Sequence, residues 1–141
     1  MKKRIFLFLL LIFAHQIILK NVYAVRYSLI APSGTLTRGQ TVTFTIMIDT
    51  QGETISNAQI GMTYQTQYLE YINTIPGDTF PNLTTIPQGE GKLIFQASSS
   101  GFTGSGTFAQ VNFKIIADAP GSSQLCVLWE VPQETITQTP S

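Results

Sequence analysis

Strict alternation between apolar and polar residues is the feature that most constrains this chain, and it is clearest over residues 55–64. The apolar face of this stretch consists of Ala58, Ile60, Met62 and Tyr64, and its polar face includes Asn57, Gln59 and Thr63. A period of two places successive side chains on opposite faces of a strand, so that one face is buried while the other meets water or a partner. The pattern predicts a strand with an accessible polar face.

The same alternation recurs along the chain, without a convincing helical period. It predicts further strands over residues 26–30, 41–49, 92–97, 108–117 and 125–131, and a short strand or edge over residues 68–72. Residues 81–91, rich in Pro, Gly and Thr, and residues 98–106, rich in Ser and Gly, are typical of loops. About seven short strands separated by turn signals predict an all-β antiparallel β-sandwich, for which Greek-key or jelly-roll connectivity fits.

Residues 1–24 have the organisation of a secretory signal peptide. A basic start at residues 2–4 precedes an unbroken apolar run over residues 5–13, and Val22-Tyr23-Ala24 offers a small-residue cleavage site. The run is too short to cross ~30 Å of hydrocarbon at ~1.5 Å per residue, which argues against a membrane anchor. We therefore predict cleavage after Ala24, a secreted or cell-surface domain over residues 25–131, and a Thr/Pro-rich tail or linker start over residues 132–141.

Cleavage would change the charge balance of the chain. The sequence has eight basic and eight acidic residues, and four of the basic ones lie in the predicted leader: Lys2, Lys3, Arg4 and Lys20. Residues 25–141, which would remain after cleavage, carry four basic against eight acidic residues, a formal charge of −4. A charge-poor, mildly acidic domain without a basic cluster is not suited to nucleic acids or to anionic membrane surfaces.

The predicted mature domain lacks the residues that most catalytic and metal sites need. The single histidine, His15, lies in the leader, so triads and general bases built on histidine, and most zinc sites, are excluded. The acidic residues fall mostly in turns or at strand ends, so we expect no enzyme and no cofactor. Asp49, Glu53 and Asp78 leave an oxygen-rich calcium site open as an alternative. The single cysteine, Cys126, is expected to be a buried, inert thiol.

Several segments resemble cohesin domains and their carbohydrate-binding-module relatives. Residues 60–70, IGMTYQTQYLE, are similar to the "ΦTYDPxxLE" segment of that family, where Φ is apolar. Further similar segments follow in family order over residues 39–44, 91–95, 104–114 and 121–125. The resemblance implies a cohesin-like jelly-roll sandwich that spans nearly the whole domain.

The resemblance also implies a partner and a binding face. Cohesins bind dockerins, small calcium-binding modules carried by cellulosomal enzymes, through sheet-face residues that include an Asn-x-Asp pair. Asn57 matches the Asn, whereas Gln59 stands where the Asp is expected, and Gln65-Thr66 stands where the family often has Asp-Pro. We expect partner binding by Asn57, Gln59 and Thr63 in a secreted, non-catalytic scaffolding module linked to polysaccharide breakdown.

Two other functions remain open. A carbohydrate-binding module of the same fold would hold a surface polysaccharide on aromatic rings. Phe102, in its predicted Ser/Gly loop, is the one ring expected to be exposed for that purpose. A structural cell-surface or adhesion domain would need no small ligand.

Overall fold

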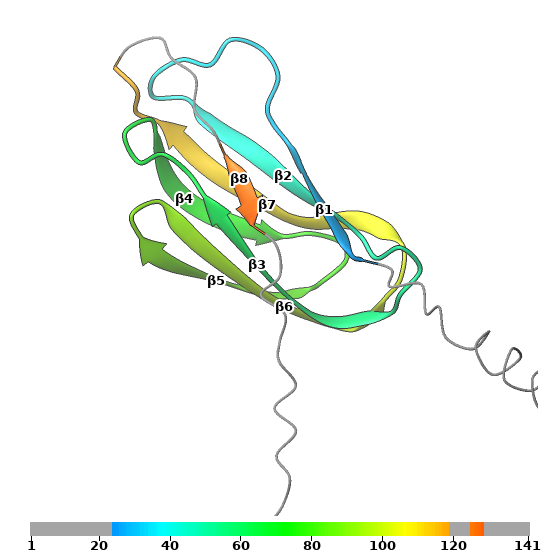
Figure 1. Cartoon of the computed structure of the whole chain (residues 1–141). Coiled ribbons are helices and arrows are strands. Elements are labelled where there is room, and N and C mark those ends of the chain that lie inside the picture. The colour runs from blue at the N-terminus through cyan, green and yellow to red at the C-terminus, as the bar shows by residue number, and fades with distance from the viewer. Residues whose placement is uncertain (1–23, 119–124, 129–141) are drawn as a thin grey trace, which may run out of the picture.

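The computed structural model describes residues 24–118 and 125–128. All the regular secondary structure of these residues is β-strand (Figure 1). The strands are β1 (Arg26–Ile30), β2 (Thr41–Asp49), β3 (Ile55–Thr63), β4 (Leu69–Pro76), β5 (Asn82–Gly89), β6 (Lys92–Phe102), β7 (Ser105–Ile115) and β8 (Cys126–Leu128). They form two four-stranded sheets, in the orders β1-β2-β7-β4 and β5-β6-β3-β8. Every pairing is antiparallel, so the predicted all-β sandwich is confirmed.

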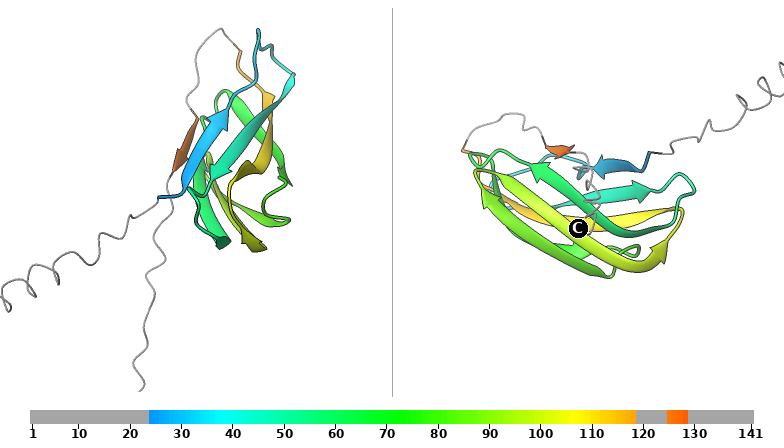
Figure 2. Two further views of the ribbon diagram at one scale, coloured as in Figure 1. Left: turned by 90° about the vertical axis from the view of Figure 1, so that its right-hand side faces the viewer. Right: turned by 60° about the horizontal axis from the view of Figure 1, so that its bottom comes forward.

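The two sheets stack face to face around one hydrophobic core (Figure 2). Central strands β2 and β6 bury every second residue, as the alternation predicts: β2 buries Val42, Phe44, Ile46 and Ile48, and β6 buries Leu93, Phe95 and Ala97. Central strand β7 departs from this period at one point, where Phe108 and Ala109 are both buried. The apolar face predicted for β3 is also correct, because Ala58, Ile60 and Met62 are buried and Tyr64 packs against them at the edge of the core. None of the described residues forms a helix with the length and hydropathy of a membrane span.

Phe113 of β7 lies at the centre of the aromatic part of this core. Its ring is fully buried and meets the rings of Phe44, Tyr64 and Tyr71 at centroid distances of 5.7, 4.8 and 6.1 Å. Tilted and edge-on ring contacts at these distances are favourable beyond the area they bury. Burial raises the pKa of the Tyr64 hydroxyl above its ordinary value, and the nearby Tyr71 adds to the shift.

Two segments predicted as loops are strands, and both errors concern the β5-β6-β3-β8 sheet. Residues 82–89 form β5, which pairs with β6 although it contains Pro87. A proline is tolerated there because β5 is an edge strand, on which half of the N–H groups have no ladder partner. The predicted Ser/Gly loop over residues 98–106 is shorter than expected, since β6 continues to Phe102 and β7 begins at Ser105.

A buried threonine ties two turns together at one end of the sandwich. Thr50 is fully buried between β2 and β3, and its backbone N–H donates to the carbonyl of Gly104 in the β6–β7 turn at 2.9 Å. The Gly104 N–H in turn donates to Oγ1 of Thr50, also at 2.9 Å. These reciprocal bonds fix the β2–β3 turn against the β6–β7 turn, where the two sheets meet.

A second close approach fixes the hairpin between β5 and β6. Glu90 and Gly91 both have positive φ, 49° and 73°, as a tight hairpin turn of the type I′ class requires. The Gly91 carbonyl accepts a bond of 2.8 Å from the Tyr64 N–H. A Cβ at position 91 would overlap the Tyr64 carbonyl, so only glycine allows this hairpin to lie against the end of β3.

Some predictions fall outside the described residues. They are the leader before Ala24, the tail over residues 132–141, and the end of the strand predicted over residues 125–131. Cys126 is described, and the prediction of a buried thiol is wrong: its side chain is exposed at the start of β8. Among the described strands, β8 lies at the edge of its sheet and pairs with β3 alone, and the alternation places Val127, not Cys126, toward the core.

Candidate partner-binding face

The three predicted binding residues lie on one side of β3, and strand pairing extends their face across β6 and β5. We call the outward residues of these strands the β5–β6–β3 face. It comprises Asn57, Gln59, Gly61 and Thr63 of β3, Lys92, Ile94, Gln96 and Ser98 of β6, and Asn82, Thr84 and Ile86 of β5. The structure thus brings Asn57, Gln59 and Thr63 together on a continuous sheet surface.

Register aligns these residues in rows across the sheet. Asn57 pairs with Ser98 and Ser98 with Asn82, which forms a row of short polar side chains. Gln59 pairs with Gln96 and Gln96 with Thr84, which forms the next row. Within that row the Gln96 Nε2 donates to the Gln59 Oε1 at 3.1 Å, so the two amides hold each other in place on an exposed surface.

The next two rows change in character. Gly61 pairs with Ile94, and Ile94 with Ile86, so an aliphatic row follows the amide row. Both isoleucines are only half-buried. In the last row Thr63 lies between Lys92 of β6 and the exposed Cys126 of β8. The face therefore runs from hydroxyl and amide groups, through aliphatic groups, to a single ammonium at its end.

A shallow hollow lies in the polar part of this face. It has a volume of about 500 Å³ and is lined by residues of β5 and β6, among them Asn82, Thr84, Gln96 and Ser98. The residues of β5 were missed at the level of sequence, because their Pro- and Thr-rich pattern is typical of a loop. The alternation in β6 was visible, since Leu93, Phe95 and Ala97 share a phase, but it did not show which strand β6 adjoins.

The predicted exposure of Phe102 is wrong. Phe102 ends β6, is half-buried, and packs against the core with its ring 6.0 Å from that of Phe80. Part of this ring is therefore covered by the core and is not available for stacking on a sugar. The carbohydrate-binding role assigned to Phe102 stays a prediction, and its expected structural basis is absent.

Two of the three acidic residues weighed for calcium accept hydrogen bonds from backbone N–H groups. The Asp49 Oδ1 accepts a bond of 2.9 Å from the Gln51 N–H, and the Asp78 Oδ1 accepts one of 2.7 Å from the Thr107 N–H. Among the described residues, no three or more Asp, Glu, His or Cys side chains gather as metal ligands would. The structure does not bring Asp49, Glu53 and Asp78 together as one site.

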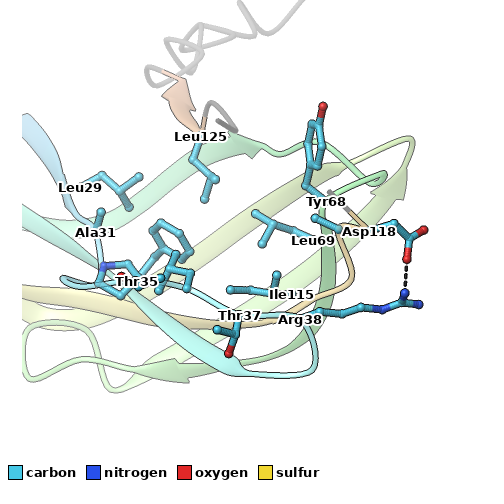
Figure 3. A pocket seen from close by; sticks show the side chains of 14 residues that line it. Leu29, Ala31, Thr35, Thr37, Arg38, Tyr68, Leu69, Ile115, Asp118 and Leu125 are labelled. Atoms are coloured by element: carbon cyan, nitrogen blue, oxygen red, sulfur yellow. Dashed lines mark hydrogen bonds and ion pairs between the residues drawn. The ribbon is translucent and has the colours of Figure 1, made fainter. Parts of the chain in front are cut away.

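A larger pocket of about 730 Å³ lies at one end of the sandwich, away from this face (Figure 3). Its walls are mostly apolar and include Leu29, Leu69 and Ile115. Its charged groups, Arg38 and Asp118, form an ion pair with each other at the rim, and both side chains are largely exposed. Besides this ion pair, the described walls offer the side-chain hydroxyls of Thr35, Thr37 and Tyr68, which are few polar groups for orienting a small-molecule ligand.

Fold and face together are those of a jelly-roll β-sandwich module with one largely polar, uncovered sheet surface. The chain belongs to the cohesin family: the family model described as "Cohesin domain" matches residues 29–130. The resemblance noted in the sequence is thereby confirmed. A comparison with curated proteins finds no match.

Solved structures agree with this assignment. CaCohA2 from Clostridium acetobutylicum, in a complex with a variant of CaDoc0917, is 18% identical with a TM-score of 0.65, covering 74% of this chain and 81% of that chain. Coh3ScaB in a type II Cohesin-X-Dockerin complex from Acetivibrio cellulolyticus is 18% identical with a TM-score of 0.62, covering 77% and 80%. A non-cellulosomal cohesin from the archaeon Archaeoglobus fulgidus is 18% identical with a TM-score of 0.52, covering 72% and 74%. At these identities the likeness establishes the fold.

Proposed function

We propose that this chain is a secreted, non-catalytic assembly module that binds a dockerin-type protein through its β5–β6–β3 face. The observation that carries the proposal is the position of Asn57, Gln59 and Thr63. All three project outward from one central strand of the β5-β6-β3-β8 sheet, onto a surface that no other described element covers. Membership of the cohesin family, and the two neighbours crystallised in complexes, support a protein partner of this class.

The linkage to polysaccharide breakdown is a separate part of the proposal. It rests on the cellulosomal role of many cohesins, whereas the similar structure from Archaeoglobus fulgidus is described as non-cellulosomal. The signal peptide predicted over residues 1–24 supports export. Export is tested by sequencing the N-terminus of the protein recovered outside the cell, which should begin at Val25.

Dockerin binding is tested with the purified domain and a panel of purified dockerin modules, CaDoc0917 among them, by calorimetric titration in the presence of calcium. We expect at least one module to bind, and Asn57→Ala to weaken that binding by about tenfold because an exposed central amide is lost from the interface. Asn73→Ala is the matched control, because Asn73 lies outward on β4 of the opposite sheet. Absence of binding across the panel, or equal losses in both variants, would refute the proposal.

A further inference from the structure

The charges of this domain are distributed unequally between its two sheets. Every strand of the β1-β2-β7-β4 sheet carries one: Arg26, Asp49, Lys114 and Glu70, in sheet order. In the other sheet, Lys92 is the only charged residue in β3, β5 and β6, and β8 has none. Lys92 starts β6, at the end of the face and two residues after Glu90 of the hairpin turn.

The centre of the β5–β6–β3 face is therefore formed by neutral groups alone. Its amide row, with the Gln96–Gln59 hydrogen bond, lies beside the aliphatic row of Ile86, Ile94 and Gly61. Because both glutamines are exposed, each keeps amide groups free to pair with a partner. The described part of the face has no aromatic ring, which favours a protein surface over a sugar ring as its occupant.

We infer that the partner of this cohesin presents an uncharged docking surface, in which amide or hydroxyl groups meet the Gln59–Gln96 row and an aliphatic side chain packs on the Ile86–Ile94 row. The inference rests on the proposed function and specifies its partner. A carboxylate or ammonium pressed onto this centre would lose its hydration without gaining an opposite charge. The face should therefore bind charged partners weakly. Its specificity comes from this penalty on charged partners as much as from the contacts made with an uncharged one.

Gln59 is the position at which this selectivity is set. The family resemblance places an acid there, and an acid would accept charge-assisted bonds from a basic partner. The glutamine keeps an acceptor oxygen, on a side chain one methylene longer than that of aspartate, but carries no charge. That amide oxygen already accepts a hydrogen bond from Gln96. A partner suited to the acid should bind this chain weakly.

The test uses a dockerin that binds in the panel described above, titrated at low and high NaCl against the unmodified domain and two variants. Gln59→Asp adds one negative charge to the centre of the face. Asn73→Asp adds the same charge to the outer side of the opposite sheet, where Asn73 accepts a 2.8 Å bond from the Asn112 Nδ2. Circular dichroism checks that both variants, which change exposed side chains, remain folded.

We expect the dissociation constant to change less than about twofold between roughly 50 and 500 mM NaCl, because screening acts only on charge pairs. Gln59→Asp should weaken binding by about tenfold or more, and Asn73→Asp should leave it unchanged. A steep loss of affinity with salt, or tighter binding by Gln59→Asp, would overturn the inference and leave the proposed function standing. If no dockerin binds, or only a glycan does, both are overturned.

Discussion

Replacing Thr50 by valine tests whether the reciprocal bonds between the two turns hold the sandwich together. Valine has nearly the same shape as threonine, so the fully buried site stays filled while Oγ1 is removed. The 2.9 Å bond from the Gly104 N–H is then lost, and that N–H faces an apolar methyl group. The Thr50 N–H bond to the Gly104 carbonyl is unaffected by the change.

The expected loss of stability follows from the surroundings of that donor. A buried N–H left without an acceptor costs about 1–3 kcal/mol. Gly104 is half-buried, so we expect about 1–2 kcal/mol for Thr50→Val. Since each kcal/mol lowers the melting temperature of a domain of this size by roughly 4–8 °C, the fall should be about 5–15 °C. Urea unfolding followed by fluorescence and thermal unfolding followed by circular dichroism both measure it.

Thr43→Val provides the matched control, because it removes a hydroxyl that also makes a hydrogen bond. The Thr43 Oγ1 donates to the Asn112 Oδ1 at 2.6 Å, but on the exposed outer face of β2, where water can replace it. We expect a loss below about 0.5 kcal/mol there. Equal losses in the two variants, or an unchanged stability of Thr50→Val, would show that burial of this bond does not set its contribution.

Three further predictions concern other parts of the fold. Gly77→Ala should destabilise the protein by about 1–3 kcal/mol or more in urea unfolding, because the added Cβ would overlap the Thr107 carbonyl; a neutral result would mean that the β4–β5 connection shifts freely. The stability that depends on a neutral Tyr64 should be intact below its unfolded pKa of about 10 and be lost as the pH rises through the higher folded pKa. Urea midpoints between about pH 8 and 11.5 should therefore fall less steeply in Tyr64→Phe, and identical slopes would contradict the shift. Exposed Cys126 should react with Ellman's reagent in the folded protein, and protection until unfolding would contradict its placement.

The central strands could be predicted from the sequence because each carries its own complete pattern. In β2 a strict period of two marks the buried residues, and the structure buries the same ones, including Phe44. In β7 the period holds from Ala109 through Phe113 to Ile115, and Phe108 is buried as well. Their ends were predicted less well, since β7 begins earlier than the alternation shows. Alternation of apolar and polar residues indicates which face of a strand is buried, and this pattern is contained within the strand's own sequence.

The outer parts of the β5-β6-β3-β8 sheet could not be predicted in this way. β5 contains Pro87 and exposes most of its residues, so its sequence is typical of a loop, and it is a strand because it pairs with β6. Phe102 has the sequence surroundings of an exposed ring, yet β6 continues through it and turns it toward Phe80. In both cases contacts with residues outside the segment itself decide the outcome.

The same distinction applies to the candidate site. The sequence by itself determined that β3 has a polar side with Asn57, Gln59 and Thr63, that the predicted mature domain has no histidine, and that the chain resembles cohesins. These properties follow from residue order and composition alone. Only the tertiary structure decided that β6 and β5 extend this side, that Gln96 bonds to Gln59, and that the extended surface has an uncharged centre. The physical reason is that a sheet face is assembled by hydrogen bonds between strands, so its composition depends on register and strand order, which alternation within a single strand does not record.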